Sequence, residues 1–344
     1  MITLIKIIPV GLLCTGLMLI TGQSYADCTL TTSGQEIIGE IPSITLTETG
    51  LRSTKFNAGI NCQVSFTLFT RSYLYYRINE MPLSYTNSMT GEQITVKYLD
   101  SANNEISKGS GRDLGGFSLV NLFSGPSGAL QFIASIDPGQ AVSPGKYKAD
   151  KSFKLTWWYS VAHAGIGAFV SKFESPGFSR GTFGFGPDSS GGSWGTGSNS
   201  SFDLSLEILP DCRIATNDVN FGTAAFATAF EPVQTSMGIR CSVKTPYKVG
   251  LNNGLYPQSG NQRAMKTSSG NNFLRYEIYK NTTSERWGSN GSEQWLSANA
   301  TTNAGVYDAK TQQGYTFTTK ILENNPDNLP AGVYSDTITV QVEF

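Results

Sequence analysis

Few residues of this chain are of a type that does covalent or acid–base chemistry. The 344-residue sequence has one histidine, His163, and five cysteines. A zinc site needs a cluster of His, Cys or carboxylate ligands, and a Ser-His-Asp triad would have to use His163 without a G-x-S-x-G turn. The Gly-rich stretches 181–186 and 191–197 lack the Lys-Ser/Thr of a phosphate-binding loop. The sequence therefore predicts no metal, no cofactor and no catalytic site; a hydrolase using His163 is the weakest alternative.

The chemistry that the cysteines predict is disulfide formation in a secreted protein. Residues 1–26 have the form of a signal peptide: a positively charged start, an apolar run over 7–20 and small residues before a cleavage site after Ala26. The apolar run is too short and too interrupted for a membrane-spanning helix. Cleavage removes Cys14 and leaves four cysteines, an even number that favours disulfides in an oxidising compartment.

The composition indicates an extracellular β protein. Charged residues make up 15% of the chain, the formal net charge is −1, and there are 37 glycines. A protein that binds nucleic acid through its phosphates needs a basic face, so this charge balance argues against such a partner. The length allows two domains of ordinary size, each able to bury a core.

The cysteines occupy the same places in two halves of the chain, which indicates an internal repeat. Each half begins Asp-Cys and reaches its second cysteine in a Gly-Ile-x-Cys tetrapeptide. The repeat predicts the pairs Cys28–Cys62 and Cys212–Cys241, each stabilising its domain by roughly 3 kcal/mol through loop closure. Further runs that alternate apolar and polar residues match between the halves and are separated by Gly, Pro and Asn turns. The predicted fold is all-β, with two immunoglobulin-like β-sandwich domains at 27–209 and 210–344.

The two halves differ at their ends. After the run 153–158 the first half continues through a Gly- and Phe-rich segment into 202–209, which alternates as a final strand does. The second half stops at Phe344, at the equivalent of the 153–158 run, so its sandwich is predicted to lack the last strand. An uncovered strand edge is a template for aggregation, and a strand given by another chain would complete the fold.

We therefore expect donor-strand complementation of the second domain. Its predicted edge strand, which would contact a chaperone or a neighbouring subunit, has the alternating residues Ile338, Val340, Val342 and Phe344. Only Asp27 would precede the first cysteine after cleavage, so the chain is expected to accept a strand and to give none. A subunit of that kind sits at one end of a head-to-tail fibre.

Apolar residues in loops of the first half form the candidate binding surface. Because the last strand ends at the linker, its start and the long loop before it are expected at the opposite end of the domain. Apolar residues among Gly, Ser and Pro, without strand or helix periodicity, mark contact surfaces. Such residues occur in the segment 160–200 and, as a second candidate, in the segment 111–128. The alternative for 160–200 is that several of them fold back as a lid over the core, and the alternative for 111–128 is that they add to the core. The candidate residues are Ile166, Phe169, Val170, Phe173, Phe178, Phe183, Phe185, Trp194, Leu119, Leu122 and Phe123.

The stretch 211–344 resembles the spore coat protein U domain. The motifs that carry the resemblance are Asp218-Val219-Asn220-Phe221-Gly222 and the stretches 238–241, 246–251 and 330–336. The first half resembles a diverged copy that keeps the cysteines and a Pro-Gly-x-Tyr turn but lacks the Phe-Gly motif. Together with the signal peptide, this arrangement resembles the two-domain tip adhesin subunit of archaic chaperone–usher (Csu-type) pili.

The resemblance implies the partners and the location of the protein. It implies passage through the periplasm with a pilus chaperone, export through an outer-membrane usher, a donor strand from the adjacent pilus subunit, and a place at the pilus tip on the bacterial surface. It also implies biofilm formation through hydrophobic finger-like loops at the distal end.

The leading hypothesis is thus a non-enzymatic tip subunit that attaches to abiotic, apolar or host surfaces. One alternative is a lectin-like tip in which Trp194 and tyrosines stack on a sugar. Another is a non-adhesive structural coat or fibre subunit. The loops are richer in Phe, Leu, Ile and Gly than in carboxylates or amides, which favours the apolar surface.

Overall fold

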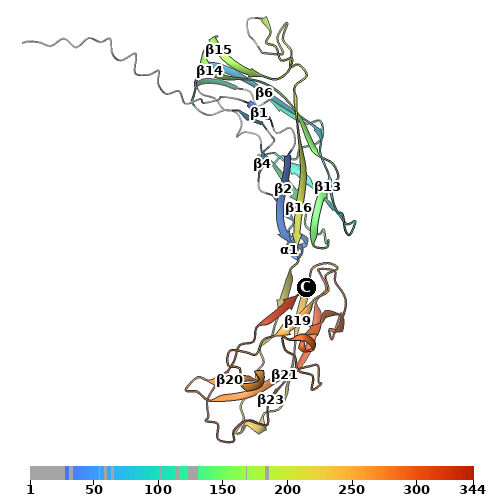
Figure 1. Cartoon of the computed structure of the whole chain (residues 1–344), viewed down its shortest axis with the longest axis vertical. Coiled ribbons are helices and arrows are strands. Elements are labelled where there is room, and N and C mark those ends of the chain that lie inside the picture. The colour runs from blue at the N-terminus through green and yellow to red at the C-terminus, as the bar shows by residue number, and fades with distance from the viewer. Residues whose placement is uncertain are drawn as a thin grey trace, which may run out of the picture.

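The computed structural model describes residues 28–344 apart from 31–33, 54, 58–59, 63–65, 101, 114–115, 123–130, 168 and 183–185; the side chains of residues 57, 61, 66, 113 and 116–122 are also not described. The predicted signal peptide lies outside these residues. The described chain is all-β, and its alternating runs form two β-sandwiches that lie end to end (Figure 1). No helix in the described part of the chain has the length and apolar character needed to span a membrane.

The N-terminal sandwich is built on one large sheet. Its strands are β2 (Gly34–Pro42), β6 (Phe66–Glu80), β7 (Ser84–Asn87), β8 (Gln93–Thr95), β10 (Gly111–Asp113), β11 (Gly116–Leu122), β13 (Gly145–Ala149), β14 (Phe153–Ile166), β15 (Phe169–Glu174) and β16 (Ser198–Leu209). β13 and β14 pair one after the other with the same edge of β16. On their far sides, β13 pairs with β7 and β14 pairs with β6. The long strands of the sheet therefore run the length of the sandwich.

A smaller sheet packs on the large one. It contains β3 (Leu51–Arg52), β4 (Phe56–Asn57), β9 (Lys97–Leu99) and β12 (Gln131–Ile136), while β1 (Cys28–Leu30) pairs separately with β5 (Ile60–Cys62). The predicted disulfide Cys28–Cys62 joins directly opposite residues of β1 and β5. Rings of both sheets meet in the core, where Phe132 and Phe153 have centroids 5.3 Å apart.

β16 is the final strand that the alternation predicts, and it is enclosed on both edges. It pairs antiparallel with β13 and β14 on one edge and parallel with β2 on the other. Its four inward side chains are at most 2% exposed: Phe202, Leu204, Leu206 and Ile208. The N-terminal sandwich is thus closed by a strand of its own chain.

The C-terminal sandwich has the same kind of architecture with fewer strands. Its strands are β17 (Cys212–Ala215), β18 (Val233–Cys241), β19 (Lys248–Leu251), β20 (Arg263–Thr267), β21 (Phe273–Lys280), β22 (Trp295–Leu296), β23 (Gln313–Ile321), β24 (Tyr334–Ser335) and β25 (Val340–Glu343). One sheet has the order β17-β18-β23-β21-β20-β24 and the other β22-β19-β25. The predicted disulfide Cys212–Cys241 joins β17 to β18. Short 3-10 helices η4 (Ala227–Ala229), η5 (Ser259–Asn261), η6 (Gly291–Glu293) and η7 (Ser297–Asn299) lie in the connections.

A short helix that the sequence analysis did not predict lies at the junction of the two sandwiches (Figure 1). α1 (Ser43–Thr49) follows β2, and no side chain of its own first turn caps it. The backbone N–H of Ile44 donates instead to Oδ1 of Asp211, which begins the C-terminal sandwich, at 2.9 Å. Such a bond satisfies one of the N–H groups that a helix start leaves unpaired. The Ile44 side chain is buried with Val243 and Ala309 of the other sandwich.

Ion pairs lie around this apolar contact, and in each of them the C-terminal sandwich supplies the cation and the N-terminal sandwich the carboxylate. Arg240 of the C-terminal sandwich binds Glu48 of α1 at 2.5 Å, and Lys244 binds Glu92 in the turn before β8 at 2.7 Å. The guanidinium of Arg213 donates to Thr45 Oγ1 at 2.9 Å. The junction is therefore a packed and charge-complementary interface in addition to the covalent linker.

The carboxylate of Glu92 makes the junction sensitive to acid. Burial alone would raise the pKa of Glu92, but hydrogen bonds from Lys244 and Ser143 outweigh burial and lower the pKa to about 2. A carboxylate with a lowered folded-state pKa stabilises the fold above its unfolded pKa of about 4.3 and loses this effect as the pH falls toward 2. We expect Glu92→Gln to lower the free energy of unfolding by about 1.5–3 kcal/mol at pH 7, the range for hydrogen bonds to charged groups, and by much less at pH 2.5.

Urea unfolding of the mature chain at pH 7 and pH 2.5, followed by circular dichroism, measures this difference. Glu231→Gln, at an exposed carboxylate of the C-terminal sandwich, is the control and is expected to change neither value. An equal loss for Glu92→Gln at both pH values would contradict the acid sensitivity.

Candidate surface-binding tip and acceptor groove

A glycine-dependent hairpin forms the end of the N-terminal sandwich that is remote from α1 (Figure 1). Ile166 of β14 pairs with Phe169 of β15, so the turn has two residues, of which Gly167 is the first, with φ +57°. At Gly165, with φ +125°, a Cβ atom would lie 2.2 Å from the carbonyl oxygen of Phe169. Only glycine tolerates this close approach and this backbone conformation. The sequence therefore fixes the position of the apolar residues that flank the turn.

Large apolar side chains of two separate segments are exposed at this end. Phe169 is 91% exposed, Ile166 is 53% exposed, and Phe69 of β6 is 58% exposed. β6 reaches the hairpin because Leu68 pairs with Ile166 and the N–H of Gly167 donates to the Leu68 carbonyl at 2.8 Å. We call Leu68, Phe69, Ile166 and Phe169 the apolar tip. An exposed group of this kind indicates a contact surface.

Sequence reasoning missed the contribution of β6 to the tip. Phe69 has φ +53°, a left-handed conformation that is strained for a bulky residue. This conformation turns Phe69 outward next to Leu68, although their neighbours Thr67 and Thr70 are buried. The signal in the sequence is the pair Leu68-Phe69, two consecutive apolar residues that break the alternation of the strand.

Phe178 was expected among exposed loop residues, and the structure places it differently. It is 8% exposed and packs on Tyr73 of β6, with ring centroids 6.1 Å apart, and on Trp194 at 5.7 Å. Trp194 is half-buried: its ring lies 5.5 Å from that of Tyr75, and its Nε1 donates to Asp188. These rings cover one another's apolar surface. At Phe178 and Trp194 the structure therefore agrees with the alternative that loop residues pack on the domain.

Polar contacts hold the segment 175–197 against the outer face of β6 and β14. The N–H of Gly186 donates to the Tyr73 hydroxyl at 2.9 Å, and Nε1 of Trp158 donates to the Gly195 carbonyl at 3.0 Å. The guanidinium groups of Arg71 and Arg180 lie 5.1 and 4.9 Å from the Tyr73 ring centroid. These contacts attach the described parts of the segment, around Phe178, Arg180, Gly186 and Gly195, to β6 and β14.

The remaining candidate residues fall into two groups. Val170 is half-buried on β15, and Phe173, also half-buried, stacks on His163 with centroids 4.1 Å apart. Leu119 and Leu122 lie on β11, whose backbone pairs with β6 beside the tip, but their side chains are not described. Three candidates lie outside the described residues: Phe123, Phe183 and Phe185.

In the C-terminal sandwich a groove lies beside β25. β25 pairs with β19 along one edge, and the segment 216–221, which continues from β17, contains no strand. Between them is a groove of about 550 Å³ whose floor is apolar core. Its lining includes Met237, Leu251, Ile278, Trp287, Phe317 and Val340. In the N-terminal sandwich β16 fills the position between β2, which follows the first cysteine along the chain, and β13 and β14.

The burial of β14 and of the corresponding C-terminal edge strand shows the effect of having or lacking a strand such as β16. Phe153, Leu155 and Trp157 of β14 are fully buried beside β16. The alternating residues of the C-terminal edge strand are only half-buried at Ile338, Val340 and Val342, and Phe344 is 57% exposed. In the part of the chain that the structure describes, no strand covers the second edge of β25. The C-terminal sandwich thus has an open apolar edge.

The described residues contain no group of three or more His, Cys, Asp or Glu side chains that could hold a metal. His163 lies on β14 and is half-buried.

The chain is similar to a known protein family and to solved structures. Residues 198–341 match the Spore Coat Protein U domain family. The chain is 49% identical to a chain in the crystal structure of the CsuC–CsuE chaperone–tip adhesion subunit pre-assembly complex from archaic chaperone–usher Csu pili of Acinetobacter baumannii, with a TM-score of 0.70 over 92% of this chain and 100% of that chain. No curated protein matches.

Two further solved structures are much more distant. A mutant of the CFA/I adhesin CfaE of enterotoxigenic E. coli is 11% identical, with a TM-score of 0.28 over 91% of this chain and 92% of that one. The CupB6 tip adhesin from Pseudomonas aeruginosa is 12% identical, with a TM-score of 0.30 over 92% and 93%.

The different burial of two phenylalanines predicts different effects on stability. Phe178→Ser removes a buried ring and is expected to lower the free energy of unfolding by about 3–5 kcal/mol. Phe169→Ser changes an exposed side chain and is expected to stay within about 0.5 kcal/mol of the unchanged protein. Urea unfolding followed by tryptophan fluorescence measures both. Equal losses in the two variants would contradict the packed arrangement of the segment 175–197.

Proposed function

The chain belongs to the family of tip adhesin subunits of archaic chaperone–usher (Csu-type) pili, and we propose that it attaches the pilus to apolar surfaces through its apolar tip. The observation that carries the proposal is the exposure of Phe69, Ile166 and Phe169 at the end opposite the junction with the C-terminal sandwich. Covering each of these side chains on contact with an apolar surface yields roughly 1.5–3 kcal/mol. Many tips acting together add avidity and support biofilm formation on abiotic or host surfaces.

The packing of the aromatic loop residues favours this function over sugar binding. A lectin site needs exposed aromatic faces with free polar groups beside them. The indole N–H groups of Trp158 and Trp194 already donate to Gly195 and Asp188, and both rings are half-buried against Tyr75. The apolar tip, in contrast, presents uncovered hydrocarbon.

The triple variant Phe69→Ser/Ile166→Ser/Phe169→Ser tests the tip. Because it removes the exposed apolar surface without touching the core, we expect attachment of piliated cells to a hydrophobic plastic to fall at least tenfold, with pilus length and number unchanged. Crystal-violet staining measures attachment, and immunoelectron microscopy measures the pili.

Met89→Ser is the matched control, since Met89 is 83% exposed in the turn between β7 and β8 of the same sandwich. It is expected to leave attachment unchanged. Normal attachment by the triple variant would exclude the apolar tip and favour a structural subunit, and inhibition of the unchanged protein by sugars would favour the lectin. Loss of pili would assign these side chains to folding.

We further propose that the groove of the C-terminal sandwich accepts a donor strand. β16 indicates what such a strand needs. Its inward side chains should alternate as Phe202, Leu204, Leu206 and Ile208 do, and it should enter antiparallel to β25, as β16 lies antiparallel to β14. A periplasmic chaperone would fill the groove first, and the adjacent pilus subunit would replace it at the outer-membrane usher. This order keeps the apolar edge covered during export.

On the same basis we assign three parts to the chain: a signal peptide cleaved after Ala26, an adhesin domain at 27–209 and a pilin domain at 210–344. The protein would pass through the periplasm and act outside the cell at the pilus tip. Its work is binding and assembly rather than catalysis.

Val340→Asp tests the acceptor groove. A carboxylate among the apolar groove residues would be left without a partner when a strand covers it, so we expect the amount of chaperone that co-purifies with the chain to fall at least tenfold. Gln341→Asp, on the exposed face of the same strand, is the control and is expected to keep the complex. Equal yields of complex from the two variants would contradict an apolar strand in the groove.

A further inference from the structure

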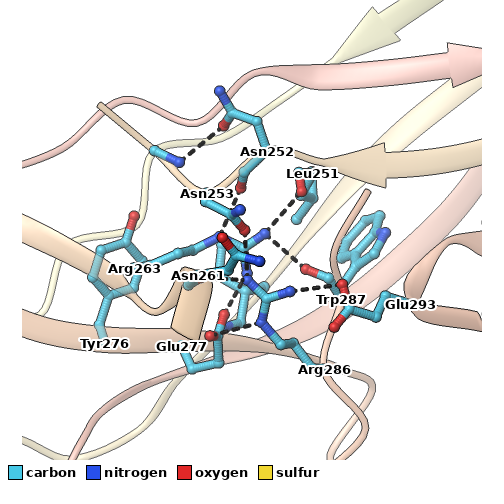
Figure 2. A network of polar contacts seen from close by, with 12 residues as sticks. Leu251, Asn252, Asn253, Asn261, Arg263, Tyr276, Glu277, Arg286, Trp287 and Glu293 are labelled. Atoms are coloured by element: carbon cyan, nitrogen blue, oxygen red, sulfur yellow. Dashed lines mark hydrogen bonds and ion pairs between the residues drawn. The ribbon is translucent and has the colours of Figure 1, made fainter. Parts of the chain in front are cut away.

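A buried ionic network joins the two sheets of the C-terminal sandwich (Figure 2). Arg263, the first residue of β20, is fully buried, and its guanidinium binds Glu277 of β21. The same guanidinium donates to the carbonyl oxygens of Asn252 at 2.8 Å, Leu251 at 3.0 Å and Trp287 at 2.8 Å. Leu251 ends β19, which belongs to the other sheet. One rigid fork of donors thus connects both sheets.

A second arginine completes the network. Arg286 donates from Nε to Glu277 at 2.9 Å and from Nη1 to Glu293 at 2.7 Å. Its Nη2 donates to the side chain of Asn253 at 2.7 Å and to the carbonyl of Asn261 at 3.0 Å. Glu277 therefore lies between two guanidinium groups, and each charge in the network has an opposite partner, which buried charges require.

The network ends at the wall of the acceptor groove. Asn252, whose carbonyl binds Arg263, exchanges two hydrogen bonds with Thr339: the Thr339 N–H donates to Oδ1 at 2.9 Å, and the Asn252 N–H donates to the Thr339 carbonyl at 3.1 Å. Thr339 stands between Ile338 and Val340, which line the groove. The other two carbonyls that Arg263 holds belong to residues of the groove floor. Floor and wall are thereby tied to one buried side chain.

In the part of the chain that the structure describes, buried charge lies in the sandwich with the open edge. Among the described residues, the buried charged side chains are Arg263, Glu277 and Lys280, and all are in the C-terminal sandwich. The N-terminal sandwich is held closed by the side chains of β16. The C-terminal sandwich has no strand in its groove, so it lacks the packing that the side chains of β16 provide in the N-terminal sandwich.

We infer that Arg263, with Glu277 and Arg286, is a positioning group that holds the β25 wall of the empty groove in place against the groove floor before a donor strand binds. The inference rests on the acceptor function proposed above. The network crosses between the sheets without help from the donor, so it fixes the β19–β25 pair, which carries one wall of the groove, against the sheet of β20 and β21 before the strand binds. Its contribution is to the rate of strand entry, because an ordered groove needs no rearrangement.

The double variant Arg263→Met/Glu277→Met separates positioning from folding. Replacing a buried ion pair by apolar residues of similar volume often leaves stability unchanged, whereas the clamps on the three carbonyls are lost. The probe is a labelled twelve-residue peptide with the sequence of β16, Ser198–Leu209, added to the full mature chain. We expect the association rate constant to fall at least tenfold, the dissociation rate constant to stay within twofold, and hydrogen–deuterium exchange in 336–340 to accelerate in the empty chain.

Lys280→Met is the control, because Lys280 is buried and ion-paired with Glu285 but does not line the groove. It is expected to change neither rate constant. Unchanged association and unchanged exchange in the double variant would overturn the positioning role and leave the acceptor function intact. The control peptide has serine in place of Leu204 and Leu206. If the unchanged protein took up neither the β16 peptide nor this control, the acceptor function would be overturned. The exchange measurement would then still decide whether the network orders the wall.

Discussion

The apolar side chains of a β-sandwich have to be covered by a strand along every edge of the core. In the N-terminal sandwich β16 meets this requirement, because it pairs on both edges and buries four alternating side chains. In the C-terminal sandwich the same position is a groove of about 550 Å³ lined by core residues. The two halves share one architecture and differ in whether the chain itself supplies the covering strand. That difference is the physical basis of the acceptor function that we propose.

The same strand also determines how the halves are joined. β2 runs parallel to β16, and Pro42 lies opposite Leu209 where both strands end. The first turn of α1 therefore starts beside the linker, and Asp211 is placed to accept from the N–H of Ile44. A parallel partner for the last strand thus leads directly to a packed junction, with ion pairs around it. The two sandwiches are therefore joined by backbone and side-chain contacts in addition to the linker.

The sequence predicted the parts of this structure that depend on local or repeated patterns. The cysteine pairs, the alternating strands and the final strand at 202–209 recur or alternate within short stretches, so they are visible without the fold. α1 was missed because its seven residues carry no capping side chain and depend on Asp211 of the other sandwich. The burial of Phe178 was missed because Tyr73 and Trp194, on which it packs, are distant in sequence. The partners of Arg263 lie on other strands for the same reason.

The apolar tip shows why exposed side chains need a rigid backbone. A phenylalanine that can reach another apolar surface packs on it, as Phe178 packs on Tyr73 and Trp194. At the tip, Gly165 and Gly167 fix the hairpin, the Gly167 N–H ties it to β6, and the strained conformation of Phe69 turns its ring outward. Side chains held in this way lose little conformational freedom on contact, so more of the hydrophobic free energy is available for attachment. With the function that we propose, strain at Phe69 and the two glycines have a common explanation: both would keep apolar surface in water until another surface covers it.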